Sequence, residues 1–184
     1  MSRIIAGTMR GRTFHVPRSG TRPTAERVRE ALFSALESRS AIRGAHVLDL
    51  YAGSGALGFE SISRGATTLT AVEAARPAAQ VIRTNARALG IRTNVVVAKT
   101  GTFLGRGISA VAGAPFHLVF LDPPYGIDVD DDLVQLADSD WLAEGAIVVV
   151  ERASRSTPPT FPARFAHVTE KTYGDTRLWI AEAE

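Results

Sequence analysis

The chain has 184 residues, of which 45% are hydrophobic and 22% charged, a composition typical of one globular domain with a sizeable core. It contains no cysteine, which excludes disulfides and thiolate metal sites. The net charge of +2 is unevenly distributed, because residues 1–43 carry nine arginines and three glutamates whereas the rest of the chain is mildly acidic.

The amino-terminal segment is basic. Its first 25 residues contain five arginines and no acid, without the apolar stretch of a signal peptide, and no later stretch is long enough to cross a membrane. We therefore expect a cytoplasmic protein without membrane contact. A basic arm on an acidic body favours a polyanionic partner such as a nucleic acid, and the alternative is a solvated tail. Residues 1–22 predict a small hairpin or arm and not an element of the core.

Strands and helices alternate along the rest of the chain. A helix is predicted from Pro23 to about Ser38, because apolar residues recur there on one face. Apolar runs at residues 46–50, 68–72, 94–98, 116–121 and 146–150 predict strands, and 77–89 has the clearest helical stripe. This alternation indicates a parallel sheet covered on both faces. The residues around Gly174-Asp175 predict a closing antiparallel hairpin, so residues 23–184 form a Rossmann-like α/β domain with a seven-stranded, mostly parallel sheet.

A glycine-rich turn follows the first predicted strand of this domain. Gly53, Gly55 and Gly58 form a G-x-G-x-x-G pattern between a strand and a helix, and Glu73 ends the next strand, 20 residues after Gly53. Glycine permits a sharp turn and the close approach of a ligand. An acid at the next strand end can accept hydrogen bonds from ribose hydroxyls, so the cofactor carries a nucleoside. Dinucleotides and S-adenosylmethionine both fit, and Asp49 can attract the cationic end of the latter.

The stretch Asp122-Pro123-Pro124-Tyr125 follows the apolar strand at 116–121. Methylation of an exocyclic amine requires that its hydrogens be accepted, so that the delocalised lone pair points at the methyl group. The Asp122 carboxylate and the Pro123 carbonyl can accept them, and Pro124 holds Pro123 in an extended conformation. Tyr125 offers a ring on which a base can stack. We therefore expect these four residues to clamp a planar amine. If the protein were a dehydrogenase, the tetrapeptide would have no evident role.

The glycine turn, Glu73 and the Asp-Pro-Pro-Tyr stretch together resemble class I S-adenosylmethionine-dependent amino-methyltransferases. The amino-terminal stretches "RIIAGTMRGRTFHVP" and "TRPTAERVREALFSAL" are similar to the bacterial RsmD family, which methylates guanine N2 in small-subunit ribosomal RNA. The resemblance covers essentially the whole chain. It implies a monomeric enzyme that uses S-adenosylmethionine, releases S-adenosylhomocysteine and acts on ribosomal RNA, within the assembled or assembling small subunit.

The resemblance also implies roles for individual residues. The catalytic set is Asp122, Pro123, Pro124 and Tyr125, and the cofactor set is Asp49, Ala52, Gly53, Ser54, Gly55, Glu73, Lys99, Thr100 and Asp122. The RNA-binding set is Arg3, Arg10, Arg12, Arg18, Arg22 and Thr24. Lys99 and Thr100 depart from the family pattern, which often places an Asp or Asn near the adenine after the third strand.

Three other readings remain open from the residues alone. The acceptor can instead be adenine N6 in DNA or RNA, or a protein amide, since each presents a planar amine. An NAD-dependent oxidoreductase or a non-catalytic RNA-binding module can share the fold. The four histidines lack metal-ligand spacing and methyl transfer from a sulfonium requires no metal, so we expect none.

Overall fold

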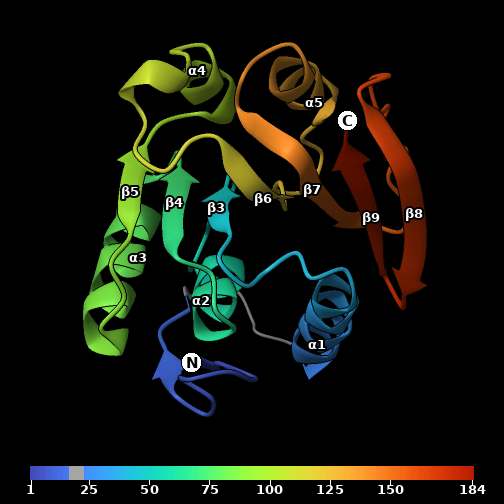
Figure 1. Cartoon of the computed structure of the whole chain (residues 1–184). Helices are drawn as coiled ribbons and strands as arrows, with labels where there is room; N and C mark the ends of the chain where they lie inside the picture. The colour runs from blue at the N-terminus through green and yellow to red at the C-terminus, as the bar shows by residue number, and fades with distance from the viewer. Residues whose placement is uncertain (17–22) are drawn as a thin grey trace.

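The computed structural model describes residues 1–16 and 23–184 (Figure 1). Its elements in chain order are β1 (Ser2–Arg3), β2 (Thr13–Phe14), α1 (Pro23–Ser38), β3 (His46–Asp49), α2 (Ala56–Ser63), β4 (Thr68–Glu73), α3 (Arg76–Leu89), β5 (Asn94–Val97), α4 (Thr100–Leu104), a 3-10 turn (Ile108–Ala110), β6 (Phe116–Leu121), α5 (Asp130–Ala137), β7 (Leu142–Ala153), β8 (Phe165–Tyr173) and β9 (Thr176–Ala183). Seven strands form one sheet in the order β5-β4-β3-β6-β7-β9-β8. Strands β3 to β7 pair in parallel, whereas β9 pairs antiparallel with β7 and β8, which confirms the predicted fold.

Two apolar cores lie on the two faces of the sheet. Leu118 and Phe120 of β6 pack with residues of α1, α2 and α3, whereas Val119 and Leu121 pack with residues of α4 and α5. Because successive side chains of a strand point to opposite faces, a strand buried on both faces needs an uninterrupted apolar run. This requirement explains the runs that mark β3, β4, β6 and β7 in the sequence.

The closing hairpin forms where the sequence predicts it. Tyr173 pairs with Thr176, so Gly174 and Asp175 form a two-residue turn in which Gly174 has a φ of 57°. Strand β9 also pairs with β7 from Ile147 to Ala153, which places the hairpin at one edge of the sheet. Strand β7 is therefore longer than the predicted run at 146–150.

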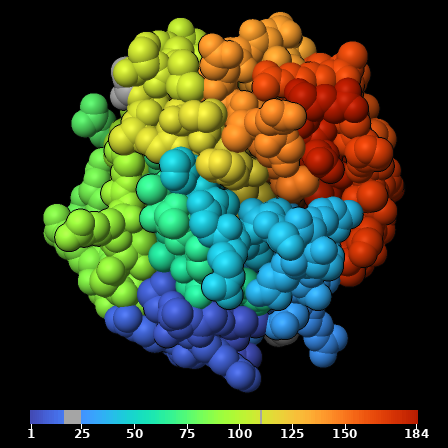
Figure 2. Space-filling model, in the orientation of Figure 1, coloured from blue at the N-terminus to red at the C-terminus, as the bar shows by residue number. Residues whose placement is uncertain are grey.

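Within residues 1–16 the expected hairpin is present, since strands β1 and β2 pair antiparallel. Contrary to the expectation, it contributes to the core, because Ile4, which follows β1, and Phe14 of β2 are only 1% and 2% exposed. Phe14 contacts Phe59 of α2 edge to face. At Gly7, which has a φ of +83°, a Cβ would lie 1.9 Å from the Ser63 carbonyl oxygen. The hairpin therefore docks tightly on α2. Figure 2 shows the amino-terminal residues, in dark blue, at the lower edge of the molecule.

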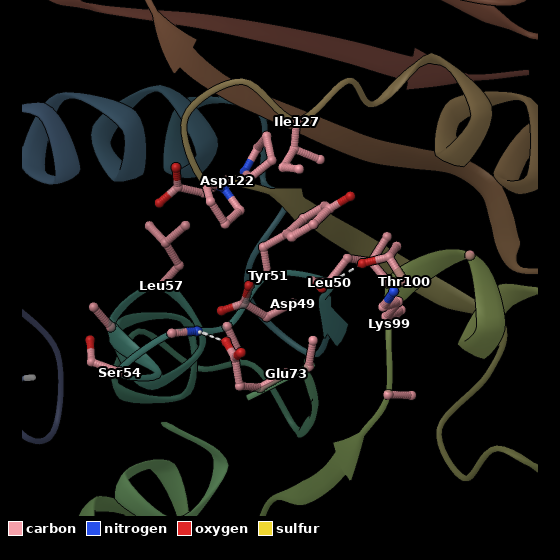
Figure 3. A pocket seen from close by; sticks show the side chains of 18 residues that line it. Asp49, Leu50, Tyr51, Ser54, Leu57, Glu73, Lys99, Thr100, Asp122 and Ile127 are labelled. Atoms are coloured by element: carbon pink, nitrogen blue, oxygen red, sulfur yellow. Dashed lines mark hydrogen bonds between the residues drawn. The ribbon is translucent and has the colours of Figure 1, made fainter. Parts of the chain in front are cut away.

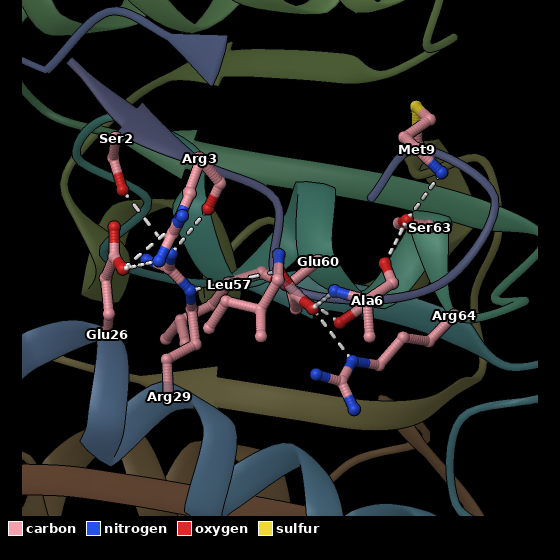
Figure 4. A network of polar contacts seen from close by, with 12 residues as sticks. Ser2, Arg3, Ala6, Met9, Glu26, Arg29, Leu57, Glu60, Ser63 and Arg64 are labelled. Carbon is pink, nitrogen blue, oxygen red and sulfur yellow. Dashed lines mark hydrogen bonds and ion pairs between the residues drawn. The ribbon is translucent and has the colours of Figure 1, made fainter. Parts of the chain in front are cut away.

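A buried carboxylate fixes this docking. Both oxygens of Glu60, which is fully buried in α2, accept backbone N–H groups of the hairpin, from Ile5 at 2.8 Å and Ala6 at 3.0 Å (Figure 4). Arg64 donates to Glu60 from Nε at 2.8 Å, and Arg29 Nε lies 3.9 Å away. Charged groups are almost never buried unless they are paired, so this network ties the hairpin, α1 and α2 into one unit.

Candidate active site

Four carboxyl groups lie at the carboxyl edge of the sheet. Neighbouring strands β4, β3, β6 and β7 carry Glu73, Asp49, Asp122 and Glu151 at or directly after their paired regions. Asp49 pairs with Phe120 in β6, and Leu121 pairs with Val150 in β7, so Asp122 and Glu151 follow paired positions. Ligands of open α/β sheets bind at this edge.

The glycine turn between β3 and α2 adopts the conformation that glycine permits. Gly53 and Gly55 have φ values of +55° and +88°. A Cβ at Gly55 would lie 2.5 Å from the Phe59 ring, and one at Gly58 would lie 2.6 Å from Leu69. Gly55 and Gly58 therefore allow close packing of α2, and Gly53 keeps backbone accessible to a ligand.

A cavity of about 770 Å³ opens beside this turn (Figure 3). Its lining includes eight of the nine residues predicted for the cofactor, namely Asp49, Ala52, Gly53, Ser54, Glu73, Lys99, Thr100 and Asp122. Gly55 does not line it, because this residue faces Phe59. Other lining residues, which the sequence did not single out, are Leu50, Tyr51, Ala56, Leu57, Ala74, Ala98, Gly101 and Ile127. Figure 3 shows Asp122 and Ile127 on one side and Glu73 and Ser54 on the other.

Glu73 lies between the turn and α3. One of its carboxylate oxygens accepts the Gly53 N–H at 2.9 Å, and the other accepts the Ala75 N–H at 2.8 Å. Each oxygen has a second lone pair for a ligand hydroxyl. The backbone N–H groups of Gly53 and Ala75 thus hold the Glu73 carboxylate in place beside the cavity.

Asp49 is a buried acid that lacks a hydrogen bond at one oxygen. It is 1% exposed, and its Oδ1 has no hydrogen-bond partner among the residues that the structure describes. Burial and the nearby charge of Asp122 raise the pKa of Asp49 to about 7. An orphaned carboxylate in such a place favours a cationic ligand, because the cation would lower the cost of its charge.

Asp122 lies where two cavities meet. A second cavity, of about 280 Å³, shares Asp122, Pro123, Pro124 and Ile127 with the first and extends to Tyr125. The Asp122 residue is exposed toward these open spaces, yet the surrounding protein desolvates its carboxyl and raises its pKa to about 6. Tyr125 is 91% exposed, an unusual state for a large aromatic side chain. The tetrapeptide therefore separates two compartments.

Lys99 and Thr100 occupy the start of α4, beside the cavity. Lys99 is exposed, whereas Thr100 is buried and its hydroxyl donates to the Leu50 carbonyl at 3.0 Å. The hydroxyl keeps its acceptor capacity. Across the described ranges, 1–16 and 23–184, no group of three or more acidic or histidine side chains is placed to hold a metal ion.

The residues predicted for RNA are placed differently from one another. Arg3 is exposed and pairs with Glu26 at 3.2 Å, and Arg10 is exposed on the hairpin. Arg12 donates to the last carbonyls of α3, at 2.8 Å to Leu89 and 2.5 Å to Ala88. A cation at this position stabilises the carboxyl end of the helix, so Arg12 has a structural role whether or not it contacts RNA. Thr24 lies in the first turn of α1, and the predicted residues Arg18 and Arg22 fall outside the described residues.

Comparisons with known proteins agree with this arrangement. Residues 2–182 match the model of the family "Conserved hypothetical protein 95". The Escherichia coli (strain K12) protein "Ribosomal RNA small subunit methyltransferase D" is 39% identical over 187 residues, which cover 99% of this chain and 91% of that protein. The chain belongs to the RsmD family.

Solved structures share the fold of this RsmD-family chain. The yhhF protein from Escherichia coli superimposes with a TM-score of 0.83 and 36% identity, over 99% of this chain and 97% of that chain. The Thermus thermophilus 16S rRNA N2 G1207 methyltransferase (RsmC), in complex with AdoMet and guanosine, shares the fold at 19% identity. Its TM-score is 0.68, over 91% of this chain and 44% of that chain.

One acid beside the candidate site was missed in the sequence. Glu151 follows the apolar run at 146–150 directly, just as Asp122 follows the run at 116–121. This shared pattern of an acid after a buried strand could have identified it. The structure places Glu151 in the lining of the second cavity, next to Asp122.

Proposed function

We propose that this protein transfers a methyl group from S-adenosylmethionine to the exocyclic N2 of a guanine in small-subunit ribosomal RNA. The observation that carries the proposal is the meeting of two cavities at Asp122 and the two prolines, in a chain of the RsmD family. The larger cavity would hold the cofactor and the smaller one the target base. The substrate would be ribosomal RNA within the small subunit, approached by a monomer.

The residues of the larger cavity fit S-adenosylmethionine. When bound, this cofactor supplies a methyl group on a positively charged sulfonium, and it also carries an ammonium group. Asp49, with its unpartnered buried oxygen, would neutralise positive charge at the glycine turn. Glu73, fixed by Gly53 and Ala75, would accept from the ribose hydroxyls. Thr100 or a nearby backbone N–H would contact the adenine.

The tetrapeptide would prepare the amine for attack. The Asp122 carboxylate and the Pro123 carbonyl would accept the two amine hydrogens, so that the nitrogen lone pair points toward the methyl group. In the transfer, a nitrogen–carbon bond would replace the carbon–sulfur bond, whose electron pair would stay on sulfur. Asp122 would accept the proton that the methylated amine loses. Tyr125, nearly fully exposed, would stack on an unpaired or flipped-out base.

The direct test uses labelled S-adenosylmethionine and small ribosomal subunits from cells that lack the protein. After the reaction, the RNA is digested and the methylated atom is identified by mass spectrometry. We expect label on one guanine N2. Label on adenine N6 or on a ribosomal protein would replace the proposed acceptor, and no label on subunits or on naked RNA would contradict the proposal. Calorimetry that compares the binding of NAD with that of S-adenosylmethionine tests the alternative of an NAD-dependent oxidoreductase, which would bind NAD.

Cofactor affinity should depend on pH through Asp49. The pKa of Asp49 is raised to about 7 in the free protein, and a cationic ligand favours the ionised carboxylate. Affinity should therefore be high above about pH 8 and fall by up to roughly tenfold per unit as the pH drops below 7. Calorimetry across this range measures it. The Asp49→Asn variant should bind more weakly at high pH with a flatter profile, and an equally steep profile in that variant would contradict the assignment.

Arg10 provides a test of the hairpin's contact with RNA. Its side chain is exposed and makes no hydrogen bond to any residue that the structure describes, so removing it should not disturb the fold. If Arg10 contacts a phosphate, Arg10→Ala should weaken RNA binding and lower the salt slope of the affinity by about one. Arg92→Ala, another exposed arginine, is the control. Equal slopes for Arg10→Ala and the wild type would remove Arg10 from the interface.

A further inference from the structure

Glu151 is the one acid of the four at the sheet edge that the proposed mechanism does not use. It follows Val150, which pairs with Leu121, and Asp122 follows Leu121 in the neighbouring strand. The two carboxyl-bearing residues are therefore side by side at the ends of adjacent parallel strands. Glu151 is nevertheless absent from the cofactor cavity and lines only the second one. It faces the compartment proposed for the base.

The Glu151 carboxyl lacks a partner there. The carboxyl accepts no hydrogen bond from the residues that the structure describes, although it is only partly exposed. Desolvation and the charge of Asp122 raise its pKa to about 8, and the positive charge of Arg29 on α1 acts in the opposite direction. A crowded carboxyl without a donor is unfavourable by itself. A ligand that brings an N–H group into the second cavity would relieve this.

We propose that Glu151 reads the target base, accepting a hydrogen bond from the N1–H of guanine while Asp122 and the Pro123 carbonyl hold N2. This inference rests on the proposed function. On guanine, the N1–H and the N2 amine are neighbours on one edge, as Glu151 and Asp122 are neighbours on one sheet edge. Adenine presents an acceptor at N1, which the ionised carboxylate would repel, whereas the N1–H of guanine would favour the ionised form. Flipped bases are generally read along this edge.

A base analogue isolates the contact. 2-Aminopurine keeps the amine at position 2 but has no hydrogen on N1. Small subunits are reconstituted with RNA that carries either guanine or 2-aminopurine at the target position. Because the pKa of Glu151 is raised to about 8, kcat/KM is measured for both at a pH above 8, where the carboxyl is mostly ionised and can only accept a hydrogen bond. We expect the wild type to prefer guanine by about 10- to 100-fold, the usual range for a hydrogen bond to a charged group. In Glu151→Gln, whose amide can donate to the unprotonated N1, the preference should fall to within a few-fold.

Glu144→Gln is the matched control, because Glu144 is an exposed acid near the other end of β7. It should keep the wild-type preference. If Glu151→Gln does not turn over either substrate, its affinities for the two subunits, measured with S-adenosylhomocysteine present, give the same ratio. A ratio equal to that of the wild type would overturn the inference while the proposed function stands. Failure of the wild type to methylate guanine N2 at all would instead overturn the proposed function.

Discussion

The Asp122→Ala variant should lose methyl transfer by about a thousandfold, the scale of removing one group that stabilises a transition state. S-adenosylmethionine affinity should remain within a few-fold at neutral pH, because Asp49, the glycine turn and Glu73 provide most of the polar lining of the cofactor cavity. The Pro123 carbonyl would remain as an acceptor for one amine hydrogen. Single-turnover kinetics with saturating cofactor measures the chemical step directly.

The same variant has a second expected effect, on the titration of Asp49. The charge of Asp122 is one of the causes that raise the pKa of Asp49, so its removal should lower that pKa. The pH profile of cofactor binding should then shift toward acid. Asp140→Ala, at an exposed position after α5, serves as the control for both effects. Full activity of Asp122→Ala would eliminate the proposed clamp, and loss of cofactor binding would mean that Asp122 serves the cofactor more than the amine.

The Glu60→Ala variant should be destabilised by about 3–5 kcal/mol, the cost of breaking a buried ion pair by removing one partner. Two hairpin N–H groups, from Ile5 and Ala6, would lose their acceptor, and the Arg29 and Arg64 guanidinium groups would lose a buried counter-charge. Both arginine side chains are less than 10% exposed. Equilibrium urea unfolding gives the difference in the free energy of unfolding.

Glu30→Ala is the control for this measurement, because Glu30 is an exposed acid on α1. It should change the free energy of unfolding by less than about 0.5 kcal/mol, as is usual for exposed positions. A loss below 1 kcal/mol in Glu60→Ala would mean that water or a rearranged hairpin replaces the carboxylate.

The fold was predictable because its central strands are buried on both faces and its last hairpin has a glycine turn. Both features are local in the sequence. The docking of the amino-terminal hairpin is not, because Ile4 and Phe14 lie in alternations too short to indicate a core and their contacts come from α2 and α3. The acceptor that holds this hairpin, Glu60, is separated from it by about 55 residues.

The candidate site was predictable to a similar extent. Asp49, Glu73 and Asp122 were placed at one sheet edge because each lies within one residue of the end of an apolar run. Gly55 was assigned to the cofactor from its place in the motif, but its conformation and the packing of Phe59 direct it elsewhere. Glu151 was missed because it lies inside β7 and not at a turn. Strand β7 continues to Ala153 and pairs with β9 of the closing hairpin over this stretch.

The long separation between the hairpin and its partners has a consequence during synthesis of the chain. Residues 4–15 are made before their hydrogen-bond partners Glu60, Asn85 and Leu89, which follow 54 to 77 positions later. Contacts of such separation form late, after the loop they close has been translated. In the nascent chain the arginine-bearing hairpin therefore cannot dock until α2 and α3 have been made. The exposed Arg10 therefore reaches its final position only after α2, which contributes Ala56 and Leu57 to the lining of the cofactor cavity, has been made.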